Sequence, residues 1–550
     1  MATGRAATER SAATARSPDR QRAAAAAAVT GLAIGFVRRG TVLVALTAGG
    51  MSAFVAVQYR SMTGSLDLAS LADLAASPAI RTLFGVPVAL DDPGGFTVWR
   101  TGTPVAVLVS VWALLAATRV TRGEEEAGRW ALLLAGPLPL RDVVSRHLVV
   151  LLTAPLLVGT VVGVALTAAG TRPLGTLLYA AGVALVGTAF AALGTLTAQL
   201  TPDRRLAGGL AGAGVGVALL TRMLADGVDR LSWLAWTSPY GLLGKVRPFA
   251  ADDPLPLVVL AGMSGVAAAA ALAVAGRRDA EGGPWTSASA RPPRLRWMRS
   301  PFGFVLHRAG RGVAMWAVGL AAYFGLVGSL APSMTRFLSE NPRFAELAAD
   351  AGVTGLTVID GYAAALFGLL ALPVGAVAAG LVSDDAADEA ARRLTAVFAL
   401  PVSRARWAVG GTAAVTAVVC LGLSIVAALA FSLGTALAGA DLSLWSSLGA
   451  ALNGLPVVAV CLGAALFALG WAPRAVFMIG WLPAVGGFLL LALADTFGWP
   501  AWTRAASPFT YVADVPVSAP DWPGAAALLV SGALLATVGI ARYSRRDLRG

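Results

Sequence analysis

Long apolar segments recur along the whole 550-residue chain, and they restrict its fold more than any other feature. Each is at least about 18 residues long, enough for a helix to cross a hydrocarbon core about 30 Å thick. Only 13% of the residues are charged, roughly half the share found in typical soluble domains. The sequence therefore predicts an all-α polytopic membrane protein.

We expect twelve transmembrane helices, six in each half of the chain. Those of the first half are predicted near 40–59, 102–120, 148–169, 174–199, 206–224 and 254–276. Those of the second half are predicted near 312–331, 361–382, 409–436, 446–471, 475–495 and 523–541.

Short sequence landmarks recur in the same order in both halves. The matching segments are "FVRRG" (36–40) and "FVLHRAGRG" (304–312), "AGPLPLRD" (135–142) and "ALPVSRAR" (399–406), "TSPYG" (237–241) and "ASPFT" (506–510), and "GRRDAEGG" (276–283) and "YSRRDLRG" (543–550). Four echoes in one order predict a duplicated unit. Because each unit has an even number of spans, the two six-helix repeats are predicted to be parallel.

The chain is expected to divide into four segments. Residues 1–28, rich in Ala, Thr and Arg, lack the apolar core of a signal peptide and are predicted to be a disordered cytoplasmic tail. Residues 29–280 form the first six-helix half, 281–300 a cytoplasmic linker, and 301–550 the second six-helix half.

The arginines predict the orientation of the chain. Most Lys and Arg residues fall in the tail, in the loops that share its side, and after residue 541. This bias predicts that both termini are cytoplasmic. The Arg, Ala and Gly usage suggests a GC-rich bacterium, so we expect a multi-pass protein of a bacterial cytoplasmic membrane. A nucleic-acid partner is a poor alternative, because the arginines are scattered among loops.

An acidic loop follows the second span of each half. Glu125 and Arg129 stand four residues apart in the acid-before-base order that stabilises a helix, and Glu389 and Arg393 repeat this spacing. The plain interpretation is a solvated loop helix with self-paired charges. Two such loops in equivalent positions favour a docking surface for a partner.

Asp388 and Arg392 form a further predicted pair in the second loop. In both loops an apolar turn follows the charges, and then a proline, Pro137 or Pro401. Ser403 can cap the next helix. The leucines at 132–134 are expected to pack against the helix bundle or against a partner.

The first loop and its flanks resemble the first cytoplasmic loop of ABC-2-type permeases. The resemblance is closest to the fused two-half permeases known as polyketide-antibiotic exporters of actinobacteria. The matching residues are Glu124, Glu125, Glu126, Gly128, Arg129, Leu133, Pro137 and Arg141 in the first loop, and Glu389, Arg393, Pro401, Val402, Ser403 and Arg404 in the second. The second loop departs from the pattern, with Arg392 in place of the glycine and Ala390 in place of an acid.

The resemblance implies an exporter permease whose loops couple to a separate ATPase. The coupling residues would be Glu124, Glu125, Glu126, Arg129, Pro137 and Arg141 in one loop, and Asp388, Glu389, Arg393, Pro401, Ser403 and Arg404 in the other. Two ATPase copies would bind ATP and Mg, and this chain would bind no cofactor or metal. The cargo would be a hydrophobic or amphipathic small molecule.

The same resemblance implies further elements. Amphipathic elbow helices would lie near 29–39 and 300–311, at the start of each half. Short extracellular re-entrant helices would carry Ser238 and Pro239 in the first half and Ser507 and Pro508 in the second. An aromatic interface belt is the simpler alternative for these Trp- and Pro-rich segments.

The chain lacks a phosphate-binding loop of its own. Its only lysine, Lys245, is followed by Val246, so no G-x-x-x-x-G-K-[ST] motif is present. A proton-coupled twelve-helix carrier is the main alternative, but it would need carboxylates inside the spans, whereas Asp360 and Asp495 lie at predicted span ends. A membrane enzyme is a further alternative, for which the two histidines supply no evident catalytic cluster.

Overall fold

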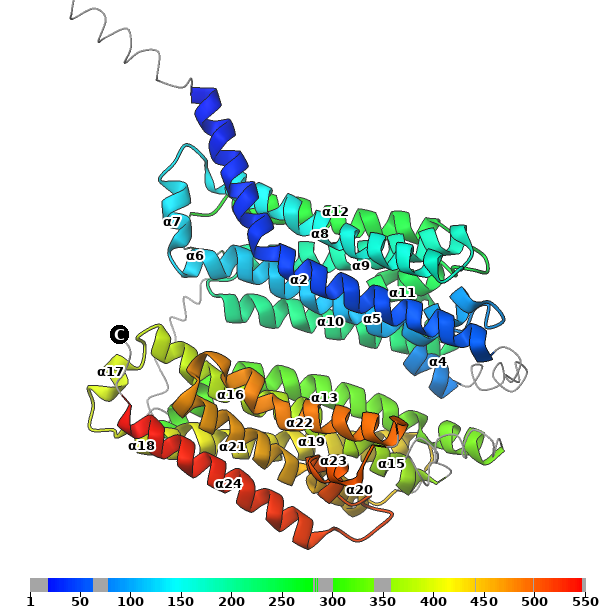
Figure 1. Ribbon diagram of the computed structural model, residues 1–550, viewed down its shortest axis with the longest axis vertical. Helices are drawn as coiled ribbons and strands as arrows, with labels where there is room; N and C mark the ends of the chain where they lie inside the picture. Colours follow the sequence, from blue (N-terminus) through cyan, green and yellow to red (C-terminus); the bar gives the residue numbers. More distant parts are fainter. Residues whose placement is uncertain are drawn as a thin grey trace, which may run out of the picture. The chain divides into compact units, whose positions relative to one another are not determined.

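The computed structural model describes residues 18–62, 78–279, 282, 284, 300–340, 358–440, 442–497 and 499–546. The secondary structure of these residues is helical, with no strand among them (Figure 1). By its internal contacts the chain divides into two units, Met1–Ser289 and Ala290–Gly550. The division falls inside the segment 281–300 that the sequence suggests as a linker.

The first unit is a bundle of long helices with short helices at both ends. Its elements are α2 (Pro18–Met62), α4 (Pro78–Phe84), α5 (Pro93–Thr118), the π-helical turn η1 (Arg119–Gly123), α6 (Glu124–Glu126), α7 (Arg129–Leu134), α8 (Leu140–Ala168), α9 (Pro173–Leu200), α10 (Arg204–Gly227), the 3₁₀ helix η2 (Asp229–Thr237), α11 (Pro239–Lys245) and α12 (Leu255–Ala275).

The second unit has the same kind of arrangement. Its elements are α13 (Pro301–Glu340), α15 (Ile359–Gly368), α16 (Ala371–Ala390), α17 (Thr395–Phe398), α18 (Arg404–Arg406), the π-helical η4 (Trp407–Ala413), α19 (Ala414–Leu437), α20 (Leu444–Asn453), α21 (Leu455–Trp471), the 3₁₀ turn η5 (Pro473–Ala475), α22 (Val476–Phe497), α23 (Ala501–Ala505), the 3₁₀ turn η6 (Pro508–Tyr511) and α24 (Trp522–Arg545).

Twelve helical segments among the described residues are long and apolar enough to cross a membrane. Six fall in each unit, and each overlaps one of the spans expected from the sequence. The prediction of an all-α polytopic membrane protein is confirmed.

Capping residues explain where several of these helices begin. Asp92 accepts hydrogen bonds from the backbone N–H groups of Gly94 and Gly95, at 2.8 and 3.1 Å, and starts α5. Asp203 and Asp521 cap α10 and α24 in the same way. An aspartate in this position satisfies N–H groups that have no partner within the helix.

The N-terminal expectations need correction. Helix α2 begins at Pro18 and continues to Met62, so the predicted disordered tail 1–28 is wrong from Pro18 onward, and residues 1–17 lie outside the described part. The predicted elbow helix 29–39 is part of α2, whose N-terminal portion bends away from the bundle (Figure 1). The six consecutive alanines at 23–28 favour helix strongly, so the helix continues through this region.

The second predicted elbow, 300–311, is likewise continuous with a membrane span. Helix α13 extends from Pro301 to Glu340 without interruption. In both units the amphipathic start and the first span therefore form one helix.

The two units pair their spans in the same order. In the first unit the fourth span, α9, contacts α5, α8, α10 and α12, and α2 packs on α8. In the second unit the fourth span, α21, contacts α16, α19, α22 and α24, and α13 packs on α19. The matching pattern supports the predicted duplication of a six-span unit.

Glycines bring α21 and α24 into close contact. A Cβ added to Gly463 would lie 2.2 Å from the carbonyl oxygen of Gly532, and a Cβ on Gly470 would lie 2.5 Å from that of Gly539. The two pairs are seven residues apart along both helices, so they lie on one face of each. Small residues of this kind allow helix backbones to approach closely in a membrane.

We expect Gly463→Ala to lower stability, because the new methyl group must push α24 away from α21. Overpacking of this kind costs about 1–3 kcal/mol. Thermal unfolding of the purified chain in detergent measures the effect. The matched control is Gly422→Ala on α19, where a Cβ would meet nothing within 4 Å. Equal thermal unfolding midpoints for Gly463→Ala and Gly422→Ala would contradict the close packing of α21 against α24.

Candidate functional site

The first loop, defined here as residues 119–139, leaves span α5 through the π-helical turn η1 and the short helix α6. Gly128 then adopts a φ of 73°, in the left-handed region that glycine enters without steric cost. Helix α7 begins at the next residue, Arg129. The turn at Gly128 brings Arg129 back beside the acids of α6.

Arg129 forms a two-point ion pair with Glu124. Its Nε and Nη2 atoms both donate to the carboxylate, and the Nη2–Oε1 distance is 2.7 Å. The side chain of Glu124 is only 8% exposed, whereas that of Arg129 is 59% exposed. The hydrogen bond to Glu124 raises the pKa of the Arg129 guanidinium. Glu124 is therefore neutralised at the protein surface by a guanidinium that faces solvent.

Glu125 is enclosed inside the first unit, where two arginines surround it. Both its carboxylate oxygens accept hydrogen bonds from Arg278, each at 2.7 Å. Arg122 Nη1 lies 3.3 Å from Oε2 of the same carboxylate. Arg278 also donates to the side-chain oxygen of Gln199. We call these four residues the first clamp; they join the segment after α5 to the end of α9 and to the segment after α12.

The second loop, defined here as residues 383–403, turns in the same way. Arg392 stands where the first loop has Gly128, and it adopts a φ of 58°. Arg393 then returns to Asp388, at 3.4 Å. A non-glycine residue in the left-handed region costs about 1 kcal/mol or more. The fold therefore requires this turn even where the sequence does not supply a glycine.

The second loop also has a buried ion pair to the end of its own unit. Arg546, which follows α24, donates from Nη2 to Oε2 of Glu389 at 2.5 Å. The two side chains are 13% and 9% exposed. We call Glu389 and Arg546 the second clamp. Arg404 adds a hydrogen bond to the backbone carbonyl of Arg546, so three segments of the unit meet here.

A buried aspartate gives the second unit an additional contact. Asp385, which is 1% exposed, accepts hydrogen bonds from Arg308 at 2.7 Å and from the indole N–H of Trp407 at 3.2 Å. Thr412 donates to the same carboxylate, and Arg308 also pairs with Asp388. Because Arg308 lies on α13, this cluster attaches the first span of the unit to the second loop.

The predicted pairs at a spacing of four residues are wrong in both loops. Arg129 pairs with Glu124 rather than Glu125, and Arg393 pairs with Asp388 rather than Glu389. The left-handed residue in each loop interrupts the helix, so the arginine meets the acid five residues before it. Glu124 and Glu125 are buried, although the resemblance implies that both belong to a surface that couples to a partner.

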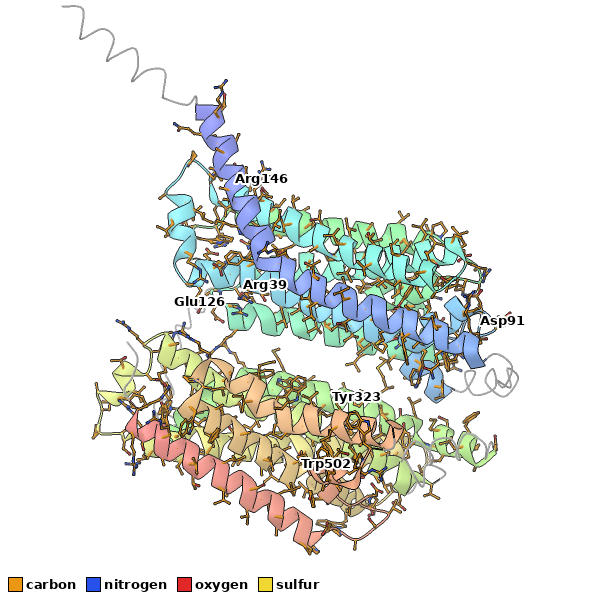
Figure 2. All side chains as sticks on the ribbon, in the orientation of Figure 1. Arg39, Asp91, Glu126, Arg146, Tyr323 and Trp502 are labelled. Atoms are coloured by element: carbon orange, nitrogen blue, oxygen red, sulfur yellow. The ribbon has the colours of Figure 1, made fainter. Side chains whose placement is uncertain are left out.

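Glu126 is the exposed member of the acidic triplet, and its carboxylate accepts a hydrogen bond from the backbone N–H of Arg204 at 3.1 Å. In Figure 2 Glu126 lies at the same end of the first unit as Arg39 and Arg146, and Asp91 lies at the opposite end. Arg39, Arg146 and the first loop thus share one end of this unit.

Beyond the clamps, each loop exposes an apolar tip. Leu132 is 80% exposed in the first loop, and Leu400 is 61% exposed in the second. Pro137 and Pro401 are exposed beside them. The first tip comprises residues 132–137 and the second tip residues 396–401.

The other side of the first tip packs against its own unit. Leu133 and Leu134 contact an apolar cluster that includes the buried Trp130. The ring of Trp130 lies 5.2 Å from the ring of His147, measured between centroids. The leucine run is therefore divided between the bundle and solvent, and Leu132 is its exposed member.

The remaining predicted loop residues lie at the start of the following helix. Ser403 Oγ accepts from the backbone N–H of Arg406 at 3.2 Å, as expected of a helix cap. Arg404 lies over the ring of Phe398 at 6.0 Å. Arg141 is exposed in the first turn of α8. These residues border the tips without belonging to either clamp.

The two Ser-Pro elements form the same hydrogen bond in both units. Ser238 Oγ donates to the carbonyl of Ala218 at 2.6 Å, and Ser507 Oγ donates to that of Gly487 at 2.8 Å. Each acceptor is in the fifth span, 20 residues before its serine. The acceptor lies nine or ten residues from the end of that span, about 13–15 Å along the helix. Ser238 and Ser507 therefore contact the fifth span well inside its end, as expected of re-entrant elements. Pro239 begins the short helix α11, and Pro508 begins the 3₁₀ turn η6.

The sequence reasoning missed the partners of the clamps. It identified the recurring Arg-Arg-Asp landmark after the last span of each half, but it assigned no role to Arg278 or Arg546. It also did not foresee the ion pair between Arg308 and Asp385. The partners Arg278 and Arg546 could have been found from the duplication, because both the glutamate of the loop and the arginine after the last span occur in each half.

The fold and the paired loops define a polytopic α-helical membrane protein whose two units share one plan. Residues 298–544 match the family model for the C-terminal domain of the multidrug efflux system permease Rv1217c. The chain is also 27% identical over 486 residues to the multidrug efflux system permease protein Rv1217c of Mycobacterium tuberculosis. That similarity covers 88% of this chain and 87% of the relative.

We expect Glu125→Gln and Arg278→Gln each to destabilise the chain severely. Glu125→Gln leaves two buried guanidinium groups without their carboxylate, and Arg278→Gln leaves Glu125 with Arg122 alone. Loss of one partner of a buried ion pair costs about 3–5 kcal/mol. The double variant should cost less than the sum of the two, because the interaction between Glu125 and Arg278 is then lost only once. Thermal unfolding of the unaltered chain, the two single variants and the double variant measures these losses as a double-mutant cycle. Glu126→Gln, at the exposed neighbouring position, is the control and should change stability by less than about 0.5 kcal/mol. Additive losses would contradict the pairing.

Proposed function

We propose that this chain is the transmembrane permease of an ABC exporter, working with a separate ATPase dimer. The similarity to a protein named as a permease of a multidrug efflux system supports the exporter class. The observation that carries the proposal is the pair of loops, each with an exposed apolar tip on a base fixed by buried ion pairs.

The tips are the parts of the loops suited to contact a partner. Leu132 and Leu400 expose apolar area that their own units leave uncovered. Exposed apolar residues rimmed by charged groups are typical of protein interaction sites. Arg129 and Arg393 supply such charge, since both guanidinium side chains are more than half exposed.

The clamps give the tips a mechanical role. Glu125 connects the first loop to the segment after the sixth span, and Glu389 does the same in the second unit. A displacement applied to the tip by an ATPase would therefore move the spans of that unit as one body. Alternating access then follows from nucleotide-driven motion of the two tips, one ATPase copy acting on each.

The cargo in this proposal is a hydrophobic or amphipathic compound of drug or antibiotic type. The name of the relative supports a drug-like cargo, and the spans are predominantly apolar. The aromatic side chains of Phe190, Phe367 and Phe431 are buried within the units, so they act as core residues rather than as a cargo surface.

We expect the chain, purified with an affinity tag from its own organism, to bring down an ATPase at two copies per permease. Leu132→Asp and Leu400→Asp should each reduce the recovered ATPase at least about tenfold, because a carboxylate replaces the apolar contact. The matched control is Val517→Asp, an exposed apolar position (54%) outside both loops. Recovery of no ATPase with the unaltered chain would overturn the proposal.

Efflux assays distinguish the proposed exporter from a proton-coupled carrier. Depletion of ATP with the proton gradient maintained should stop efflux from cells expressing the chain and its ATPase. A protonophore added while ATP is maintained should leave efflux unchanged. The reverse pattern would favour the carrier.

A further inference from the structure

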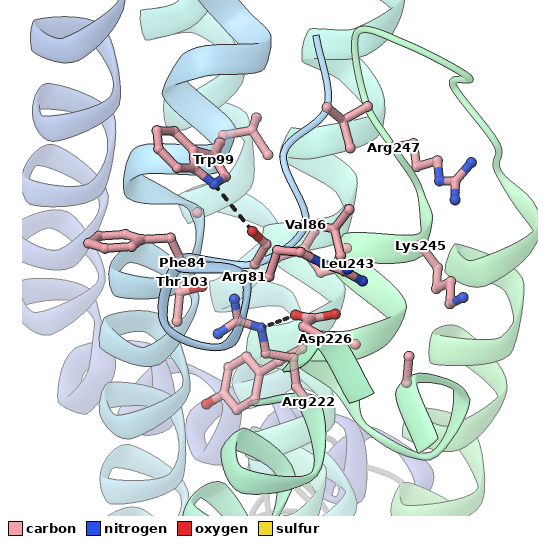
Figure 3. A pocket seen from close by; sticks show the side chains of 18 of the residues that line it. Arg81, Phe84, Val86, Trp99, Thr103, Arg222, Asp226, Leu243, Lys245 and Arg247 are labelled. Atoms are coloured by element: carbon pink, nitrogen blue, oxygen red, sulfur yellow. Dashed lines mark hydrogen bonds and ion pairs between the residues drawn. The ribbon is translucent and has the colours of Figure 1, made fainter. Parts of the chain in front are cut away.

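A pocket of about 250 Å³ lies in the first unit, at the opposite end from the first loop. Its walls come from the segment around α4, the start of α5, the end of α10 and the helix α11 (Figure 3). By the predicted orientation this end faces the outside of the cell.

Four cationic side chains line this pocket, together with a single carboxylate. The cations are Arg81, Arg222, Lys245 and Arg247, and the carboxylate is Asp226. In Figure 3 Lys245, the last residue of α11, and Arg247, two residues after it, lie across the pocket from Phe84 and Trp99. The lining therefore carries a surplus of positive charge. On the predicted outer side this surplus runs against the usual distribution of basic residues.

The most deeply buried of these cations is already balanced. Arg222 is 4% exposed, and its Nε lies 2.7 Å from Asp226 Oδ2. Gly85 allows the guanidinium to approach, because its φ is 99° and a Cβ there would lie 2.7 Å from Nη2. The indole of Trp99 donates to the carbonyl of Gly85 and holds this segment in place, at 3.2 Å. Arg222 and Asp226 therefore form a fixed wall.

Arg81 retains an unused donor at the pocket. Its Nε atom is buried and has no hydrogen-bond partner among the described residues. Its Nη2 atom meets Asp229 at 3.2 Å, but the side chain of Asp229 is 86% exposed. An ion pair to so exposed a carboxylate is weak. A buried guanidinium N–H normally finds an acceptor, so this donor indicates one that the protein does not supply.

The shared fold does not require these charges. The Ser-Pro hydrogen bonds align Ala218 with Gly487, and the same alignment places Leu491 opposite Arg222 and Asp514 opposite Lys245. The second unit forms the same re-entrant element without these cations. The charges are therefore a particular property of the first unit.

We propose that this pocket binds the phosphate group of an anion that reaches it from the outer side of the membrane, with Arg81 and Lys245 as its ligands. A guanidinium and an ammonium are suitable donors to phosphate oxygens. Phe84 and Trp99 provide an apolar wall beside them, which suits a phosphodiester carrying hydrocarbon. A phospholipid headgroup and free phosphate share this chemistry.

The test uses the full purified chain in detergent and follows thermal unfolding and native mass spectra. One arm titrates phosphatidylglycerol, and the other titrates inorganic phosphate against chloride at equal ionic strength. Saturable stabilisation by phosphatidylglycerol alone identifies a lipid headgroup, and saturable stabilisation by inorganic phosphate identifies the free anion. Either result supports the site, and saturable binding of neither overturns it.

Variants tie the binding to the pocket. Arg81→Gln should weaken the binding about tenfold, the loss expected for one charge-assisted hydrogen bond. Lys245→Gln should weaken it similarly and serves if the first variant does not fold. The matched control is Arg172→Gln, an exposed arginine at the same end that pairs with Asp92 outside the pocket. Equal weakening by all three variants, or none by Arg81→Gln and Lys245→Gln, would refute the site.

Discussion

The architecture of each unit depends on a buried ion pair between a glutamate of its acidic loop and an arginine that follows its last span. Glu125 with Arg278, and Glu389 with Arg546, connect segments that are more than 150 residues apart in the chain. A single carboxylate in such surroundings would be costly, and its partner removes that cost only while both stay in register. The pair therefore fixes the loop relative to the end of the helix bundle, and the turn at Gly128 or Arg392 then sets the direction of the tip.

The same pair shows why sequence reasoning reached the fold more readily than the site. Span length and apolar character are local properties, so the twelve membrane helices were predictable. The predicted pairing of Glu125 with Arg129 also relied on a local property, their spacing of four residues, but that prediction assumed an uninterrupted helix. Gly128 interrupts that helix, and the partner of Glu125 comes from the far end of the unit, which no local spacing reports. The prediction for the N-terminal segment failed for another reason: its Ala-, Thr- and Arg-rich composition without an apolar core suggested a disordered tail, whereas the alanine run at 23–28 has a high helix propensity and is helical in α2.

The two units differ in where they place charge inside a common frame. The first unit adds Arg122 to its clamp and carries surplus cations around Arg81 at the opposite end. The second adds Asp385, which binds Arg308 and so attaches α13 to the second loop. The two additions at the loops occupy positions whose counterparts are uncharged, because Ala386 stands opposite Arg122 and Thr121 opposite Asp385 in the loop alignment. Each of these two added charges has a partner within its own unit, so the loops share geometry without sharing every contact.

The division of labour within each loop follows from the same electrostatics. A carboxylate already satisfied by a buried guanidinium gains little from a second partner, and withdrawing it from the clamp would leave Arg278 or Arg546 unpaired. The glutamates are therefore poor recognition groups, although they are the most conspicuous feature of the sequence. The side chains of Leu132 and Leu400 are mostly exposed to solvent, so contact with a partner does not require them to leave a buried contact within their own unit. In the proposed complex the apolar tips and the exposed guanidinium groups of Arg129 and Arg393 would make the contact, and the buried acids would keep those groups in position while force passes through the loop.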